Sequence, residues 1–129
     1  MIARNLNELR VYQKALDGSK AVSALLNRRG LRRDFKLRNQ LSEASDSTCS
    51  NISEGFGQSD RKFAQHLHTA IGSANEVCTR LTIARQREYI TAEQFTETTA
   101  TFEAVGKMAT RLVQYLERRP PGIDDSNRQ

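Results

Sequence analysis

The sequence predicts an all-α protein, specifically an antiparallel up-down-up-down four-helix bundle. Its length of 129 residues fits a single domain. The only two prolines, Pro120 and Pro121, fall close to the end of the chain, and proline is rare inside helices. Apolar residues also recur at helical spacings of three and four in four successive segments. We therefore expect a bundle over residues 1–117 and a disordered C-terminal tail over residues 118–129.

The first predicted helix covers residues 6–27 and carries a wide apolar face. Its inner row has spacings of four and three and consists of Val11, Ala15, Gly18, Val22 and Leu25. The arginine-rich segment 28–34 interrupts the pattern. We expect Gly30 to end the helix there in the left-handed conformation that glycine adopts without strain.

The second predicted helix covers residues 34–53 and has a thin inner row rich in small residues. That row is Leu37, Leu41, Ala44, Thr48 and Ile52. A thin face of this kind favours close packing, so Ser47 and Asn51 would need hydrogen-bond partners if buried. We expect Gly55 and Gly57 to end this helix.

The third and fourth predicted helices complete the bundle. The third covers residues 59–88, begins with Ser59 or Asp60 as its cap, and has an unbroken apolar repeat from Phe63 to Ala84. The fourth begins after Thr91 and ends at Arg118, and Gln94 stands where a capping box requires it. Short connections between helices of this length favour antiparallel neighbours.

Basic side chains gather where the first two helices meet. Six cations surround the single acid Asp34, an excess equal to the formal charge of +5 for the whole chain. In an antiparallel bundle the end of the third helix reaches the same pole, where Glu88, Glu93 and Glu97 partly offset its cations. Guanidinium groups suit phosphate because they offer a bidentate fork. We therefore predict a nucleic-acid-binding surface composed of Arg28, Arg29, Arg32, Arg33, Lys36, Arg38, Arg85 and Arg87.

Sequence readout and base stacking are not expected at this surface. No RNA-recognition signature, zinc finger or helix-turn-helix pattern is present, and Phe35 is the one aromatic residue among the arginines. Contact with the nucleic-acid backbone is the most that the charge supports. The alternative reading is a protein-interaction or scaffold bundle whose arginines contact acidic proteins or only solvate the connection.

The chain lacks the residue patterns of the enzyme classes that we considered. No phosphate-binding loop occurs, and neither His66 nor His68 follows a glutamate by the three residues that a di-iron site requires. Cys49 and Cys78 have no zinc-binding spacing and are expected to be reduced and half-buried. We therefore expect no catalysis, no cofactor and no metal. We also expect no membrane span and a cytoplasmic location.

Four ordered motifs resemble the four-helix-bundle family of proteins encoded in intervening sequences of 23S ribosomal RNA. That family includes the accessory variability determinant of diversity-generating retroelements. The motifs are L-R-V-Y-Q-K-A at 9–15, L-R-N-Q-L at 37–41, N-I-S-E-G at 51–55 and F-A-Q-H-L-H-T-A-I-G-S-A-N-E at 63–76. The resemblance implies a bacterial homo-oligomer, often a pentamer. It also implies RNA or DNA as a partner, and a reverse transcriptase or another nucleic-acid enzyme as a second partner.

The sequence departs from this family at two places. Ser42 and Glu43 stand where relatives commonly carry arginines, and R-R-D-F replaces a proline-containing connection. The first departure weakens the transfer of a nucleic-acid surface to the second helix. The second places the basic surface at the pole of the bundle.

Six residues of the shared motifs are interpreted as structural. We expect Asn51 and Glu54 to bond backbone groups of a turn and Gly55 to adopt a positive φ. We expect Gly72 and Ser73 to permit close helix approach, and Glu76 to pair with a basic side chain of a neighbouring helix or subunit.

Overall fold

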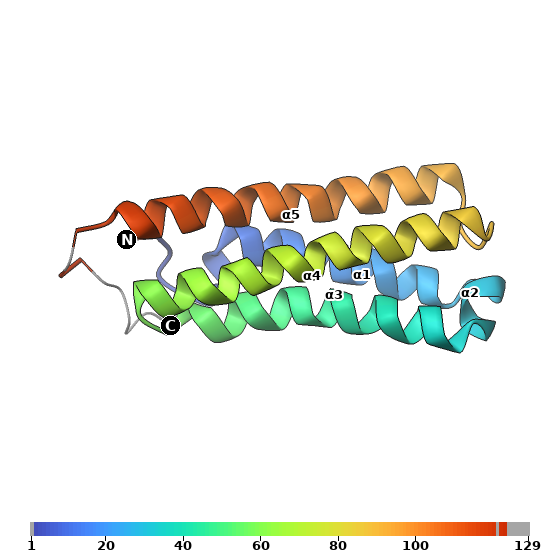
Figure 1. The fold of residues 1–129 in the computed structure, drawn as a ribbon, viewed down its shortest axis with the longest axis horizontal. Helices are drawn as coiled ribbons and strands as arrows, with labels where there is room; N and C mark the ends of the chain where they lie inside the picture. Colours follow the sequence, from blue (N-terminus) through green and yellow to red (C-terminus); the bar gives the residue numbers. More distant parts are fainter. Residues whose placement is uncertain (1, 121, 124–129) are drawn as a thin grey trace.

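Four long helices lie side by side along a rod in the computed structural model, which describes residues 2–120, 122 and 123 (Figure 1). The helical elements, in chain order, are the 3₁₀-helix η1 (Leu6–Glu8), α1 (Arg10–Leu26), α2 (Arg29–Arg33), α3 (Phe35–Phe56), α4 (Asp60–Gln86) and α5 (Ala92–Arg118). The described part of the chain contains no strand. No helix in it has both the length and the apolar character needed to cross a membrane.

The long helices form a closed ring of neighbours. α3 packs against α4, α4 packs against α5, and α1 packs against both α3 and α5. Successive long helices run in opposite directions, so α2, the start of α3, the end of α4 and the start of α5 share one end of the rod (Figure 1). This arrangement confirms the predicted antiparallel bundle and its sharing of poles.

The bundle interior contains two apolar clusters along the rod. One lies toward η1 and the end of α5 and includes Phe56 and Phe63, whose rings meet edge to face with centroids 6.0 Å apart. The other lies toward the α2 end and includes Phe102. A Cβ atom at Gly18 would lie only 2.7 Å from the ring of Phe102, so this glycine lets α1 and α5 approach closely.

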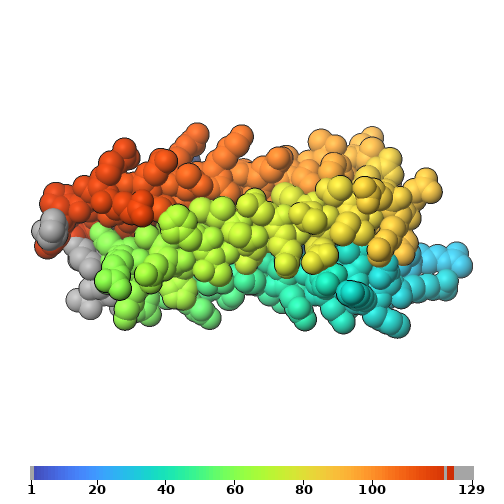
Figure 2. Space-filling view, viewed as in Figure 1, coloured from blue at the N-terminus to red at the C-terminus, as the bar shows by residue number. Residues whose placement is uncertain are grey.

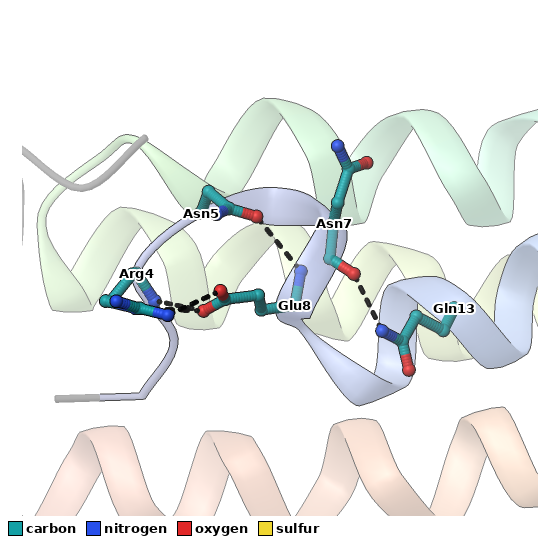
Figure 3. Close-up of polar contacts among 5 residues, drawn as sticks. All are labelled: Arg4, Asn5, Asn7, Glu8 and Gln13. Carbon is teal, nitrogen blue, oxygen red and sulfur yellow. Dashed lines mark hydrogen bonds and ion pairs between the residues drawn. The ribbon is translucent and has the colours of Figure 1, made fainter.

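The N-terminal segment divides at Leu9, where we had expected one continuous helix over 6–27. The Asn5 side chain accepts a hydrogen bond from Glu8 N and caps η1 (Figure 3). Arg4 and Glu8 form an ion pair of 3.1 Å across the same turn. Leu9 is extended, with φ −76° and ψ 115°, and its side chain is buried. The break therefore places the apolar side chain of Leu9 in the core, whereas a continuous helix would orient that side chain differently.

Segment 28–34 separates α1 from α3 as expected, but it contains the short helix α2 (Arg29–Arg33). Gly30 lies inside α2, and the described residues with positive φ are Glu88 and Gly122, so Gly30 is not a left-handed helix stop. A Cβ atom on Gly30 would collide with the ring of Tyr89. The glycine is needed because the connection between α4 and α5 packs directly on α2.

Helix α3 continues through Gly55, where we had predicted its end. The helix reaches Phe56, and Gly57 caps it with a φ of −87°. Gly55 is buried, and a Cβ atom there would lie 2.6 Å from His66 Cβ and 2.9 Å from Phe63 Cδ1. The predicted positive φ is therefore wrong. The glycine instead allows α3 and α4 to approach closely just before they connect.

The start of α5 has the predicted cap, and its end has contacts that the sequence did not predict. Thr91 and Gln94 form the predicted capping box at its start. At its end, Arg118 is helical, and Arg119 forms an ion pair of 3.0 Å with Asp60 while its side chain is only 5% exposed. The helix therefore ends at Arg118, as its apolar pattern predicted, although we had placed Arg118 and Arg119 in the tail. Pro121 and residues 124–129 of that tail lie outside the described residues.

Candidate nucleic-acid interface

The predicted basic side chains lie together at the end of the rod that carries α2. We refer to them as the basic end, which comprises Arg28, Arg29, Arg32, Arg33, Lys36, Arg38, Arg85 and Arg87. They come from α2 and its cap Arg28, from the start of α3, and from the end of α4 and its cap Arg87. Figure 2 shows the light-blue and cyan atoms of the first two segments projecting from this end. All are exposed except Arg38, which is half-buried.

Asp34 is the centre of the hydrogen bonds that hold this end together. Its carboxylate caps α3 by accepting from Leu37 N at 3.3 Å. It also accepts from Arg87 Nη1 at 2.6 Å and from the Tyr89 hydroxyl at 3.0 Å. Desolvation alone would raise the pKa of Asp34, but these hydrogen bonds outweigh it and hold that pKa below its usual value. The carboxylate is therefore ionised at neutral pH.

Two further cations connect the basic end to the turn between α4 and α5. Arg28 Nε donates to the carbonyl oxygen of Tyr89 at 2.9 Å. Arg85 Nη1 donates to the carbonyl oxygen of Ile90 at 3.4 Å. The Arg28 bond and the Arg87 ion pair hold α2 and the start of α3 against the end of α4 and this turn, whereas the Arg85 bond fixes the turn on α4. Arg28, Arg85 and Arg87 therefore have a structural role at this end of the bundle.

The other exposed cations of the basic end form no such contact with any described residue. Arg29, Arg32, Arg33 and Lys36 are exposed, and none has an ion pair or side-chain hydrogen bond with any described residue. The acids expected to offset this charge, Glu88, Glu93 and Glu97, are exposed and form no ion pair with them in the described chain. The basic end thus presents several cations without a neutralising acid, on helices that the contacts of Asp34 and Arg28 hold in place.

A small hollow lies beside the Asp34 ion pair, between α3 and α4. It has a volume of about 200 Å³, and Lys36, Arg80 and Arg87 contribute its basic lining. The Nε atom of Arg80 is buried without a hydrogen-bond acceptor in the described part of the chain. Cations therefore extend from the tip of the rod onto the groove between α3 and α4.

A larger hollow, of about 700 Å³, lies at the opposite end of the rod. Its lining includes His68, Asp60 and Arg119. Arg119 is mostly buried and ion-paired there, and it also lies over the ring of Tyr115 with its guanidinium carbon 5.4 Å from the ring centroid. Its charge is therefore less available to a phosphate than the charges of α2.

Residues of the motif that we interpreted as structural form a chain of polar contacts between α3 and α4. Asn51 Nδ2 donates to Ser47 O at 2.9 Å, and Asn51 Oδ1 lies 3.2 Å from His66 Nδ1. The hydroxyls of Ser47 and Ser73 are 2.8 Å apart. The expectation that Ser47 and Asn51 find partners is confirmed. Asn51, however, contacts its own helix and α4 rather than a turn.

Three other residues of that motif have roles different from those predicted. Gly72 is exposed, and a Cβ atom there would meet no atom within 4 Å, so the predicted close helix approach is wrong. Glu54 and Glu76 are exposed and form no hydrogen bond or ion pair with any described residue. Neither the turn contact of Glu54 nor an ion pair of Glu76 with a neighbouring helix is therefore present.

The described residues contain no cluster suited to a metal ion. No group of three or more His, Cys, Asp or Glu side chains among them could hold a metal ion. Cys49 and Cys78 are free and half-buried, as expected. Burial raises the pKa of both thiols, and nearby Asp46 and Glu103 raise it further, so both stay protonated at neutral pH.

Tyr89 is the residue of this end that sequence reasoning missed. Its side chain contacts Gly30 and Asp34, and its carbonyl oxygen accepts from Arg28. Asp34 carries a local signal, since an aspartate before an amphipathic segment is a typical helix cap. Tyr89 carries none, because its partners lie about fifty-five residues or more earlier in the chain.

Comparison with known proteins gives a family and a fold. A family model described as 23S rRNA-intervening sequence protein matches residues 7–111. A solved structure from Bacteroides thetaiotaomicron, a protein with unknown function from the S23 ribosomal protein family, is 24% identical with a TM-score of 0.73. The similarity covers 81% of this chain and 98% of that one. No protein with a curated description matches.

Proposed function

The chain belongs to the family of 23S rRNA-intervening sequence proteins, and we propose that it is a non-enzymatic, homo-oligomeric bundle that binds RNA or DNA through its basic end. One observation carries the proposal. Arg29, Arg32, Arg33 and Lys36 are exposed together on α2 and α3, with no internal partner in the described chain. Leaving like charges together costs free energy through their mutual repulsion, and a polyanion removes that cost.

The chemistry of these groups favours phosphate as the ligand. Three of the four are arginines, whose planar guanidinium donates two parallel hydrogen bonds to phosphate oxygens and is weakly hydrated. Side chains on one short helix and its successor reach consecutive phosphates without reading base edges. We therefore propose contact with the nucleic-acid backbone, with affinity that falls steeply as salt rises.

Self-association is the second part of the proposal. Leu16 on α1 and Tyr115 on α5 are each 43% exposed, which is high for large apolar side chains. Such residues would be buried between copies of the bundle, and a pentamer is the assembly that the family resemblance implies. A ring of copies would repeat the basic end several times around one axis. It could then serve as an accessory to a reverse transcriptase or another nucleic-acid enzyme.

The test combines light scattering on a size-exclusion column with a salt titration of RNA binding. The proposal expects a stable oligomer that binds a short structured RNA at physiological salt. It also expects log K to fall linearly with log salt at a slope of about −0.7 to −0.9 per phosphate contact. Fluorescence anisotropy of a labelled RNA measures that slope directly.

The alternative, a scaffold that contacts proteins only, predicts a different result in the same experiment. An oligomer that takes up neither RNA nor DNA at physiological salt would overturn nucleic-acid binding and favour the scaffold. A monomer that binds RNA would overturn self-association alone, because the basic end is complete within one chain.

A further inference from the structure

Phe35 is the most exposed large apolar side chain in the described part of the molecule. It is 73% exposed, compared with 43% for Leu16 and Tyr115 and 53% for Ile123. It is the first residue of α3 and follows the cap Asp34 directly. Phe35 belongs to neither apolar cluster of the core. Exposing a phenyl ring to water is unfavourable, so its position calls for an explanation.

The fold gives this ring no structural role. A hydrophobic staple at the start of α3 would need apolar residues just before the cap and in the first turn, but Arg33 and Arg38 occupy those positions. Phe35 makes no aromatic contact with a described residue. Its ring is therefore accessible.

Cations surround this ring on both sides in the sequence. Arg32 and Arg33 precede it at the end of α2, and Lys36 and Arg38 follow it in α3. Arg38 lies one turn further along α3 on the same side, and its buried Nε has no acceptor in the described part of the chain. The intervening Asp34 already accepts three hydrogen bonds, so its charge is largely satisfied by internal donors.

An exposed aromatic face among cations is the arrangement that binds single-stranded nucleic acid. A flat ring stacks on any unpaired base, and cations beside it contact the flanking phosphates. A base inside a duplex is already stacked on both sides and cannot reach the ring unless it leaves the helix. A surface of this kind discriminates by strand state rather than by sequence.

We propose that Phe35 is a stacking platform for an unpaired base, so that the basic end prefers single-stranded over double-stranded nucleic acid. This inference rests on the proposed function, because the stacked base belongs to the same polynucleotide. It also differs from the sequence analysis, which did not expect base stacking at this surface. That expectation rested on the small number of aromatic residues, whereas the proposed stacking depends on the exposure of Phe35.

The test measures the affinity of the full chain for oligouridine, oligothymidine and a duplex RNA of equal length by fluorescence anisotropy. Phe35→Ala should weaken binding of both single strands by about 5- to 150-fold, the range expected for one base–aromatic stack. Duplex affinity and the salt slope should stay unchanged, because no charge is removed. The two single strands distinguish RNA from DNA as the source of the base.

Two control variants separate stacking from other contributions. Phe35→Tyr keeps an aromatic face and should bind single strands as the parent does. Phe35→Leu keeps apolar bulk without that face and should behave like Phe35→Ala. Arg32→Ser combined with Arg33→Ser should weaken binding of single strands and duplex alike and lower both salt slopes. Circular dichroism checks that helicity is retained in each variant.

Three outcomes would overturn the inference, and each has a distinct meaning. If the parent protein binds no polynucleotide, both the proposed function and this inference are wrong. A parent that binds single strands no better than Phe35→Ala does leaves the proposed function intact and removes the stacking role. A change in oligomer mass on Phe35→Ala would identify the ring as a contact between copies of the chain instead.

Discussion

The hydroxyl of Tyr89 donates a hydrogen bond of 3.0 Å to Asp34 Oδ2, which connects two loops at the same end of the bundle. The ring of Tyr89 lies against Gly30, and its carbonyl oxygen accepts from Arg28. The hydrogen bond with Asp34 also raises the pKa of the Tyr89 phenol. This residue therefore fixes the support from which the unpaired arginines project.

The stability of the bundle should depend on the ionisation of Asp34. Its pKa is lowered in the folded state, so its contribution is fully present above the unfolded value of about 3.9. That contribution is lost as pH falls through the lower folded pKa. Asp34→Asn should cost about 0.2–1 kcal/mol near neutral pH, since the carboxylate and its Arg87 partner are near the surface. Urea unfolding at a series of pH values measures this difference.

The same titration distinguishes Asp34 from the other carboxylates. The free-energy gap between the parent and Asp34→Asn should shrink as pH falls below about 4. A gap that stays constant over that range would show that the charge of Asp34 contributes nothing.

Two glycine-to-alanine substitutions should change stability in opposite directions. Gly55→Ala places a methyl group against His66 and Phe63, and overpacking of this kind costs about 1–3 kcal/mol. Gly72→Ala meets no atom within 4 Å and gains up to about 1 kcal/mol from helix propensity. Chemical denaturation of the two variants provides a matched comparison. Equal effects would contradict the assigned roles of both glycines.

The contact between Asn51 and His66 should show energetic coupling. Their side chains lie 3.2 Å apart and connect α3 with α4. A double-mutant cycle with alanine at both positions should give a coupling of about 0.5–1.5 kcal/mol, the usual net value of one hydrogen bond. The control is the same cycle with His68, which is exposed. Coupling of equal size in the control would argue against a direct Asn51–His66 bond.

Removing three cations of the basic end should weaken nucleic-acid binding without loss of fold. Serine at Arg29, Arg32 and Arg33 removes no internal contact, whereas Arg28 donates to Tyr89 and is best left in place. The magnitude of the salt slope should fall by about 2 to 3, and the affinity at physiological salt should fall with it. Anisotropy titrations at several salt concentrations measure both.

A variant at the opposite end supplies the control for this charge change. Serine at Arg61, Lys62 and Arg111 removes the same charge from exposed positions. Its affinity and salt slope should stay close to those of the parent. If this control loses binding and the α2 variant does not, the site lies at the opposite end.

The sequence by itself determined the fold class, because helical periodicity is a local property. The apolar rows from Val11 and Phe63 repeat at spacings that bury one face, and no proline interrupts them. The capping box at Thr91 was equally local and is present as predicted. The gathering of the basic side chains at one end followed from antiparallel topology alone.

Only the tertiary structure decided what individual side chains do at close range. Gly30, Gly55 and Gly72 look alike in the sequence, yet the first two accommodate a neighbouring side chain and the third faces open space. The partnership of Tyr89 with Asp34 depends on how two distant connections meet. Periodicity specifies which face of a helix is buried. Which atoms meet across helices depends on interhelical distance and rotation, and these are set by the packing of the whole bundle.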